Sequence, residues 1–159
     1  TIAKRLLQHE RQMISGIGGN TALGGSARAL ENLAKHYLGE QNGQIGDALV
    51  RDKVAKHRMN DHAFRLTTAR AFEEAKAGKS DGNLSAMFKY YGSEQNKRKF
   101  ELMLEIMGQQ GLGWEGEGFE ARELDITRQW LRSKANSIEG GTSEVQLNIV
   151  AKRVLGLPD

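Results

Sequence analysis

Apolar residues recur along most of the chain at the three- and four-residue spacing of one helix face, and glycine-rich stretches separate these periodic segments. The pattern predicts six helices, at about Ile2–Ile14, Thr21–Leu38, Asp47–Ala77, Leu84–Met107, Ala121–Lys134 and Ser143–Leu155. No alternating run of β-branched residues lies between turn signals, so no strand is predicted.

The helix ends carry ordinary start and stop signals. Ser15-Gly16 ends the first helix, and Asp47 is a candidate N-cap for the third. The glycine-containing stretches 39–46, 78–83 and 108–118 are predicted to be loops. Because only a short turn joins the long third and fourth helices, they should lie antiparallel, as in an up-and-down bundle. We predict an all-α, four-helix-bundle-like domain of about six helices that covers residues 1–159.

Composition narrows the possible functions. Of the 159 residues, 38% are hydrophobic and 27% charged, which is enough to bury one core. The absence of cysteine excludes disulfides, thiolate zinc sites and thiol nucleophiles. The 23 basic and 20 acidic residues are well mixed, so the net charge of +3 does not indicate a nucleic-acid partner. The basic cluster Lys97–Lys99 is expected on a solvated helix face.

Membrane and metal binding are not predicted. No apolar run approaches the ~18 residues of a membrane span, and the first ten residues lack the apolar centre of a signal peptide. We therefore expect a soluble, cytoplasmic chain. His57 and His62 are five residues apart, whereas two ligands on one helical face need four, and His9-Glu10 is not part of a zinc motif.

The most informative segment lies near the C-terminus. Gly140 and Gly141 allow the backbone to turn sharply and approach a ligand closely. Thr142 and Ser143 can then cap a helix, with Gln146 completing a capping box. The amides at such a helix start suit an anionic or polar ligand edge. From the residues alone, a capped amphipathic helix without a ligand is the favoured interpretation.

This segment also resembles a known family. IEGGTSEVQ, followed by NIVAKRVLGLP, resembles the C-terminal signature of the acyl-CoA dehydrogenases, flavoproteins that introduce a trans-2,3 double bond into acyl-CoA thioesters. LLQHERQMISG (6–16) is similar to the first helix of that family's C-terminal domain, and YGSEQNKRKFELMLEIMGQQGL (91–112) to its helix–glycine-loop segment. The resemblance covers nearly the whole chain and is least specific over 22–79.

The resemblance implies an oxidoreductase whose other parts are not in this chain. In the family, an N-terminal helical domain and a middle β-domain precede this one, so the chain resembles the C-terminal domain alone. It implies FAD as cofactor, an acyl-CoA substrate, and electron transfer to an electron-transfer flavoprotein or similar acceptor in fatty acid or lipid degradation. The isolated domain should not catalyse. The alternative is a non-catalytic helical subunit of a hetero-oligomeric dehydrogenase.

The reaction requires a carboxylate base, and two glutamates compete for the role. A positioned Asp or Glu removes the weakly acidic α-proton of the thioester. Many members carry the catalytic glutamate at the position that Gly140 holds here, next to Glu139. Members with a small residue there are similar to this chain in having glutamate before arginine on the first helix, which here is Glu10. The resemblance favours Glu10 over Glu139 and places Gly140 and Gly141 against the substrate.

Cofactor contacts follow from the resemblance in the same way. The positions that match flavin or dinucleotide contacts in relatives are Thr142, Glu144, Gly108, Gln109 and Gly111. Many relatives also carry an R-x-x-F-G segment, followed by a glutamine, that holds the dinucleotide. Residues 39–70 lack that motif. This departure puts classical straight-chain substrates in doubt.

The late helices carry more apolar residues than one buried stripe needs, which predicts self-association as a dimer or tetramer. The residues concerned are Met103, Ile106, Met107, Val145, Ile149, Val150 and Val154. Relatives use this domain in that way. The alternative is that these apolar residues pack against other helices of the same chain.

Overall fold

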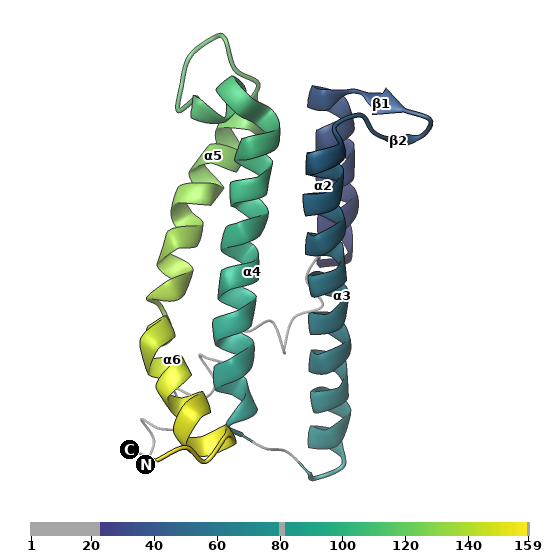
Figure 1. Cartoon of the computed structure of the whole chain (residues 1–159). Helices are drawn as coiled ribbons and strands as arrows, with labels where there is room; N and C mark the ends of the chain where they lie inside the picture. The colour runs from purple at the N-terminus through teal and green to yellow at the C-terminus, as the bar shows by residue number, and fades with distance from the viewer. Residues whose placement is uncertain (1–22, 80–81, 159) are drawn as a thin grey trace. The chain divides into compact units, whose positions relative to one another are not determined.

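A computed structural model of the chain describes residues 23–79 and 82–158, and these are almost entirely helical (Figure 1). The elements in chain order are α2 (Leu23–Leu38), β1 (Glu40–Gln41), β2 (Gln44–Ile45), α3 (Ala48–Lys76), α4 (Leu84–Met107), the 3₁₀ turn η1 (Gly108–Leu112), α5 (Ala121–Ser133), the 3₁₀ turn η2 (Lys134–Ser137), α6 (Ser143–Ile149) and the π-helical η3 (Val150–Val154). The predicted all-α class is confirmed. The helix expected over 2–14 lies outside the described residues.

The described residues form two compact units. The hairpin unit consists of residues 23–62 and 95–134, and the motif unit of residues 63–79, 82–94 and 135–158. Helices α3 and α4 each contribute one half to either unit. None of the helices in these ranges is long and apolar enough to cross a membrane.

The hairpin unit is a bundle around one apolar core. Leu30 on α2 is 0% exposed and Ile106 on α4 is 2% exposed. The buried core residues come from α2, the hairpin, α3, α4 and α5: Leu30, Leu33, Ala34, Ile45, Val50, Val54, Phe100, Leu102, Met103, Ile106, Met107 and Ile126. The prediction that a partner surface includes Met103, Ile106 and Met107 is therefore wrong, because these residues are buried in the chain's own core.

Ion pairs fix the directions of the helices in the hairpin unit. Lys53 near the start of α3 pairs with Glu105 near the end of α4, so these helices run antiparallel as predicted. Thr127 on α5 contacts the Gly111 carbonyl just after α4, and Lys134, just after α5, pairs with Glu101 at 2.6 Å, so α5 runs antiparallel to α4. Each pair is half-exposed, so it contributes little to stability and the buried core holds the bundle together.

A small hairpin replaces the loop predicted over 39–46, and this expectation was wrong. Glu40 pairs with Ile45 and Gln41 with Gln44 in an antiparallel register. The turn is Asn42-Gly43, with φ angles of 51° and 78°, a dipeptide that favours two-residue hairpin turns because both residues tolerate positive φ. The dipeptide was the available signal, but the strands are too short to show an alternating pattern.

Asp47 begins α3 as the sequence predicted. Its Oδ1 accepts a hydrogen bond from the Val50 amide at 2.9 Å, and its carbonyl accepts from the Arg51 amide at 3.0 Å. The carboxylate thereby satisfies one of the amides that a helix start leaves without an intrahelical partner.

In the motif unit, α3 and α4 meet through aromatic rings. The buried Phe64 ring lies 6.1 Å from Phe88 and 5.3 Å from Tyr91, measured between centroids. A Cβ on Gly92 would meet the Phe64 ring at 3.2 Å, so glycine allows close approach of this side chain. Aromatic packing thus replaces the aliphatic packing of the hairpin unit.

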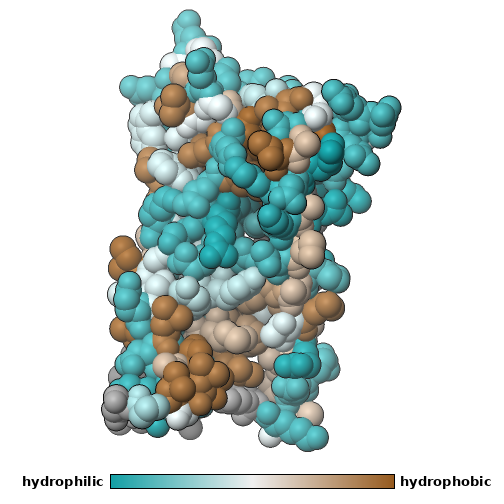
Figure 2. All heavy atoms as spheres, in the orientation of Figure 1, coloured by the Kyte–Doolittle hydropathy of each residue, from teal (hydrophilic) through white to brown (hydrophobic). Residues whose placement is uncertain are grey.

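The C-terminal part of the motif unit leaves apolar side chains exposed. Val145, Leu147, Leu155 and Leu157 are between 44% and 64% exposed. Figure 2 shows apolar side chains gathered over the end of the last helix. The helix predicted over 143–155 is in fact seven residues of α-helix followed by a π-helical turn.

Tyr37 joins α2 to α5 by donating its hydroxyl hydrogen to the carboxylate of Glu123. Burial raises the pKa of Tyr37 to about 12, and the hydrogen bond to Glu123 adds to the shift. Glu123 also accepts from the Glu120 amide at 2.7 Å in a capping box that starts α5. One carboxylate therefore serves both the helix start and the contact with α2.

We predict that Asp47→Ala lowers the free energy of unfolding by about 1 kcal/mol, because the Val50 amide loses its acceptor. Urea unfolding followed by circular dichroism measures the change. Asp52→Ala is the control, since Asp52 is exposed and makes only an i,i+4 pair with Lys56. Equal losses in the two variants would contradict the capping role.

A second prediction concerns alkaline pH. Because the pKa of Tyr37 is about 12 in the folded chain against an ordinary 10, its contribution to stability is complete below pH 10 and is lost as pH rises toward 12. Titration of tyrosinate absorbance should show one of the three tyrosines ionising late. In Tyr37→Phe the late step should vanish and the loss of stability over that range should be smaller. A late step that persists would count against the assignment.

Candidate functional site

The segment between η2 and α6 carries most of the predicted site residues. Ile138 and Glu139 both donate their amides to the Ala135 carbonyl at 2.9 Å, which ends η2 in a tight turn. Gly140 and Gly141 follow with φ angles of 64° and 96°, a left-handed conformation that other residues rarely adopt. The two glycines are therefore required by the backbone path, as the sequence predicted.

Side chains from two helices hold the carbonyls of these glycines. The Gln146 Nε2 donates to the Gly140 carbonyl at 3.0 Å and lies 3.4 Å from the Gly141 carbonyl. The Lys89 Nζ donates to the Gly141 carbonyl at 2.7 Å. Lys89 and Gln146 are each 0% exposed, so both contacts are shielded from water. The double-glycine turn is thus fastened from α4 and from α6.

The helix cap differs from the predicted capping box. Thr142 alone is the N-cap, and its hydroxyl accepts a hydrogen bond from the Val145 amide at 3.3 Å. Ser143 is the first helical residue, and the Gln146 side chain turns back to the glycine carbonyls instead of completing the box. The reason is that the left-handed turn leaves two carbonyls that need a donor, and the Gln146 amide provides it.

Lys89 was not singled out from the sequence. It stands in the apolar stretch Ala86–Tyr91, and a lysine flanked there by buried Phe88 is the signal that could have identified it. Burying an ammonium group is costly unless it is hydrogen-bonded, so such a residue is rarely placed in a core without a specific acceptor. Here the acceptor includes the carbonyl of Gly141.

Of the two candidate bases, only Glu139 lies among the described residues. Glu139 is half-buried, and its carboxylate accepts a hydrogen bond from the Asn136 side chain. Glu10 lies outside the described residues. Glu144 is exposed in the first turn of α6, two residues beyond Thr142.

Two buried polar atoms beside the turn have no hydrogen-bond partner within the described part of the chain. They are the Ser143 hydroxyl oxygen and the Gln146 Oε1. Buried acceptors are normally satisfied in folded proteins. Together with the Thr142 hydroxyl, they give the start of α6 a polar character.

The predicted GQQG contacts lie in the hairpin unit, within η1. Gly108 has a φ of 57°, and no atom lies within 4 Å of the position a Cβ would take, so its backbone is open to a ligand. Gln109 is exposed. Gly111 is buried, a Cβ there would meet the Leu104 carbonyl at 3.1 Å, and packing within the chain explains the glycine.

The region without the R-x-x-F-G segment, residues 39–70, forms the hairpin and most of α3. Its first arginine, Arg51, donates from Nη1 to the Ile45 carbonyl at 3.0 Å and so holds β2 against α3. The sequence from Gly39 to Asp47 contains two acidic residues and no arginine or lysine. This segment therefore lacks the basic side chains that an anion-binding segment uses.

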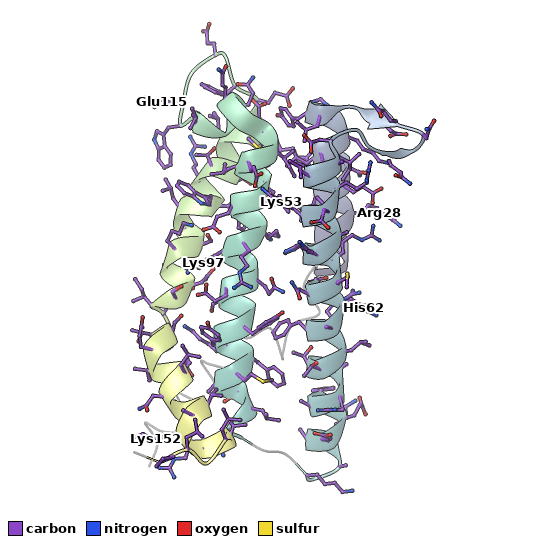
Figure 3. All side chains as sticks on the ribbon, viewed as in Figure 1. Arg28, Lys53, His62, Lys97, Glu115 and Lys152 are labelled. Carbon is purple, nitrogen blue, oxygen red and sulfur yellow. The ribbon has the colours of Figure 1, made fainter. Side chains whose placement is uncertain are left out.

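His57, Asp61 and Lys99 form a titratable cluster in the hairpin unit, and packing within the chain explains their pKa shifts. Burial lowers the pKa of His57 and of Lys99, while nearby Asp61 counteracts both shifts. Among the described residues no three His, Asp or Glu side chains are grouped as a metal site would need. Figure 3 shows Lys97 on α4. Lys99 is half-buried and lies over the Phe100 ring at 4.2 Å, so the predicted solvated basic face is only partly solvated.

Comparison with known proteins gives the family. Acyl-CoA dehydrogenase IpdE1 of Mycolicibacterium smegmatis (strain ATCC 700084 / mc(2)155) is 30% identical over 132 residues, which cover 83% of this chain and 31% of that protein. The chain thus spans about a third of the length of this relative. The Tcur3481-Tcur3483 steroid ACAD G363A variant superposes with a TM-score of 0.76 at 23% identity, over 99% of this chain and 40% of that one.

A second solved structure, the FAD complex of PigA, superposes with a TM-score of 0.65 at 25% identity, over 85% of this chain and 34% of that one. The family profile described as "Acyl-CoA dehydrogenase, C-terminal domain" matches residues 1–155, a range that includes the glycine turn and helix cap described above. The chain therefore belongs to the acyl-CoA dehydrogenase C-terminal domain family.

Proposed function

We propose that the chain is the C-terminal domain of an FAD-dependent acyl-CoA dehydrogenase that oxidises the α,β-bond of an acyl-CoA thioester. The observation that carries the proposal is the glycine turn with its capped helix start, where Thr142 presents a hydroxyl beside two buried acceptors. Family membership supports the reaction class.

The cofactor proposal rests on the polar start of α6 and on η1. Thr142 and Glu144 would contact the flavin, and the open backbone of Gly108 and the exposed Gln109 would lie against a dinucleotide, whereas the buried Gly111 would only shape the turn beside it. The residues present fit such a group, because the Thr142 hydroxyl, the Glu144 carboxylate and the Gln109 amide are all polar. FAD supplies a hydride acceptor for the β-hydrogen of the substrate. The FAD complex of PigA, a structural neighbour, is consistent with this cofactor.

For the base we propose Glu10, with Glu139 as the alternative. The carboxylate of Glu139 already accepts from Asn136, which draws it back toward its own segment. A base must reach the α-proton of the substrate directly or through one water. Gly140 and Gly141 would allow the thioester to approach the backbone without a side chain in the way.

A second candidate function is a non-catalytic subunit of a hetero-oligomeric dehydrogenase. The Tcur3481-Tcur3483 steroid ACAD, a structural neighbour, is named for two proteins, which supports this candidate. The divergent hairpin, with acidic residues where relatives carry an R-x-x-F-G segment, points the same way. A subunit of this kind would keep the bundle and lack a working base.

Self-association through the exposed apolar side chains of the motif unit is part of the proposal. Val145, Leu147, Leu155 and Leu157 remain in contact with water in the single chain. Covering them in a homodimer or tetramer would remove apolar surface from solvent.

The test of the reaction uses the complete reading frame that contains this chain. Glu10→Gln should retain bound FAD and lower the rate of flavin bleaching by acyl-CoA about 10²- to 10⁴-fold, the usual contribution of a general base. Glu139→Gln is the matched control and should lower the rate less than 10-fold. A flavin-free wild-type protein would overturn the proposed reaction, and a larger loss in Glu139→Gln would reverse the assignment of the base.

The test of assembly is sedimentation velocity at high micromolar concentration. Leu155→Glu should shift the wild-type oligomer toward monomer, because a charge would be buried at the contact. Leu49→Glu serves as control, since Leu49 is 76% exposed at the start of α3 in the hairpin unit. A wild-type chain that sediments as a monomer would contradict self-association.

A further inference from the structure

We propose that Lys89 is a positioning residue for the candidate flavin site: its buried ammonium group, together with Gln146, fixes and polarises the Gly141–Thr142 peptide. The inference rests on the proposed function in so far as Thr142 is taken as a flavin contact. Lys89 lies on α4, 52 residues away from Gly141 in the sequence, and donates to its carbonyl at 2.7 Å.

The contact belongs to a set of anchors that fastens the motif to one helix. Ser137, at the end of η2, donates its hydroxyl hydrogen to Glu94 on α4 at 3.1 Å. Lys89 and Glu94 are about 7.5 Å apart along the α4 axis, from a rise of ~1.5 Å per residue. The three residues between Ser137 and Gly141 include both Glu139 and Gly140. Helix α4 therefore holds this short segment at its two ends.

The chemistry of the donor distinguishes this anchor from an ordinary hydrogen bond. An ammonium group at 0% exposure has given up its hydration and depends on protein acceptors. Its hydrogen bond to a carbonyl is charge-assisted and therefore stronger than a neutral one. Drawing electrons toward the Gly141 oxygen also makes the Thr142 N–H of the same peptide a better donor.

The Gln146 amide supports the same turn from the other side. Its Nε2 donates to the Gly140 carbonyl, and the Gly141 carbonyl lies within 3.4 Å. A Cβ on Gly141 would meet that nitrogen at 2.6 Å, so the turn and the amide fit closely. With Lys89 and Gln146 in place, the carbonyls point toward the core and Thr142 is held at the N-cap. The orientation of Thr142 thus depends on donors that themselves need not touch a ligand.

The experiment compares Lys89→Met with wild type in the complete flavoprotein. Methionine keeps the length and apolar body of the side chain and removes the charge, which leaves the Gly141 carbonyl without this donor. We expect a lower melting temperature, amide exchange that quickens most in residues 138–145 of the flavin-free protein, and FAD binding weakened about 10-fold or more. Lys76→Met, at an exposed lysine of the same unit, should change none of these.

Gln146→Leu provides a second variant that leaves the charge in place. It should loosen the same segment, and the double variant should show a non-additive effect on FAD binding because both donors serve one turn. Wild-type exchange and FAD affinity in Lys89→Met would overturn the proposal. Faster exchange spread evenly throughout the protein would also overturn it, by assigning Lys89 a purely structural role. If wild type binds no FAD, the proposed function fails, and local exchange still decides the role of Lys89.

Discussion

Burial of α4 is the constraint on which the rest of the structure depends. Along its length the helix contributes buried residues to both units, from Ala86 and Phe88 at one end to Ile106 and Met107 at the other. A helix surrounded on several sides shows little separation of apolar and polar faces. The same helix orders the hairpin unit through aliphatic packing and fastens the signature turn through polar contacts. A single element thus links the core to the candidate site.

The bundle was predictable because its signals are local. Asp47 caps α3 as expected, the predicted limits of α4, Leu84 and Met107, are those observed, and the antiparallel course of the two long helices followed from their short connection. Local details that the apolar spacing does not encode escaped prediction. The π-helical end after Ile149 and the capping box of Glu120 and Glu123 were not foreseen.

The candidate site was predictable in its residue types and not in its support. The glycine pair and Thr142 were identified from the motif, and the structure places them in the expected turn and cap. The role of Gln146 was misassigned because a capping box and a donor to reversed carbonyls use the same sequence spacing. Lys89 was missed because periodicity describes which face a residue occupies and not which carbonyl lies opposite it.

The hairpin at Asn42-Gly43 is a place where the sequence can change in length without disturbing the helices. The Gly46 amide donates to the Gly39 carbonyl at 2.9 Å, so the chain enters and leaves the hairpin at adjacent points. Residues inserted at the Asn42-Gly43 tip would leave the paired ends of the hairpin, and so the distance between α2 and α3, unchanged. The tip is therefore free to diverge in length and charge while the bundle beneath it stays fixed.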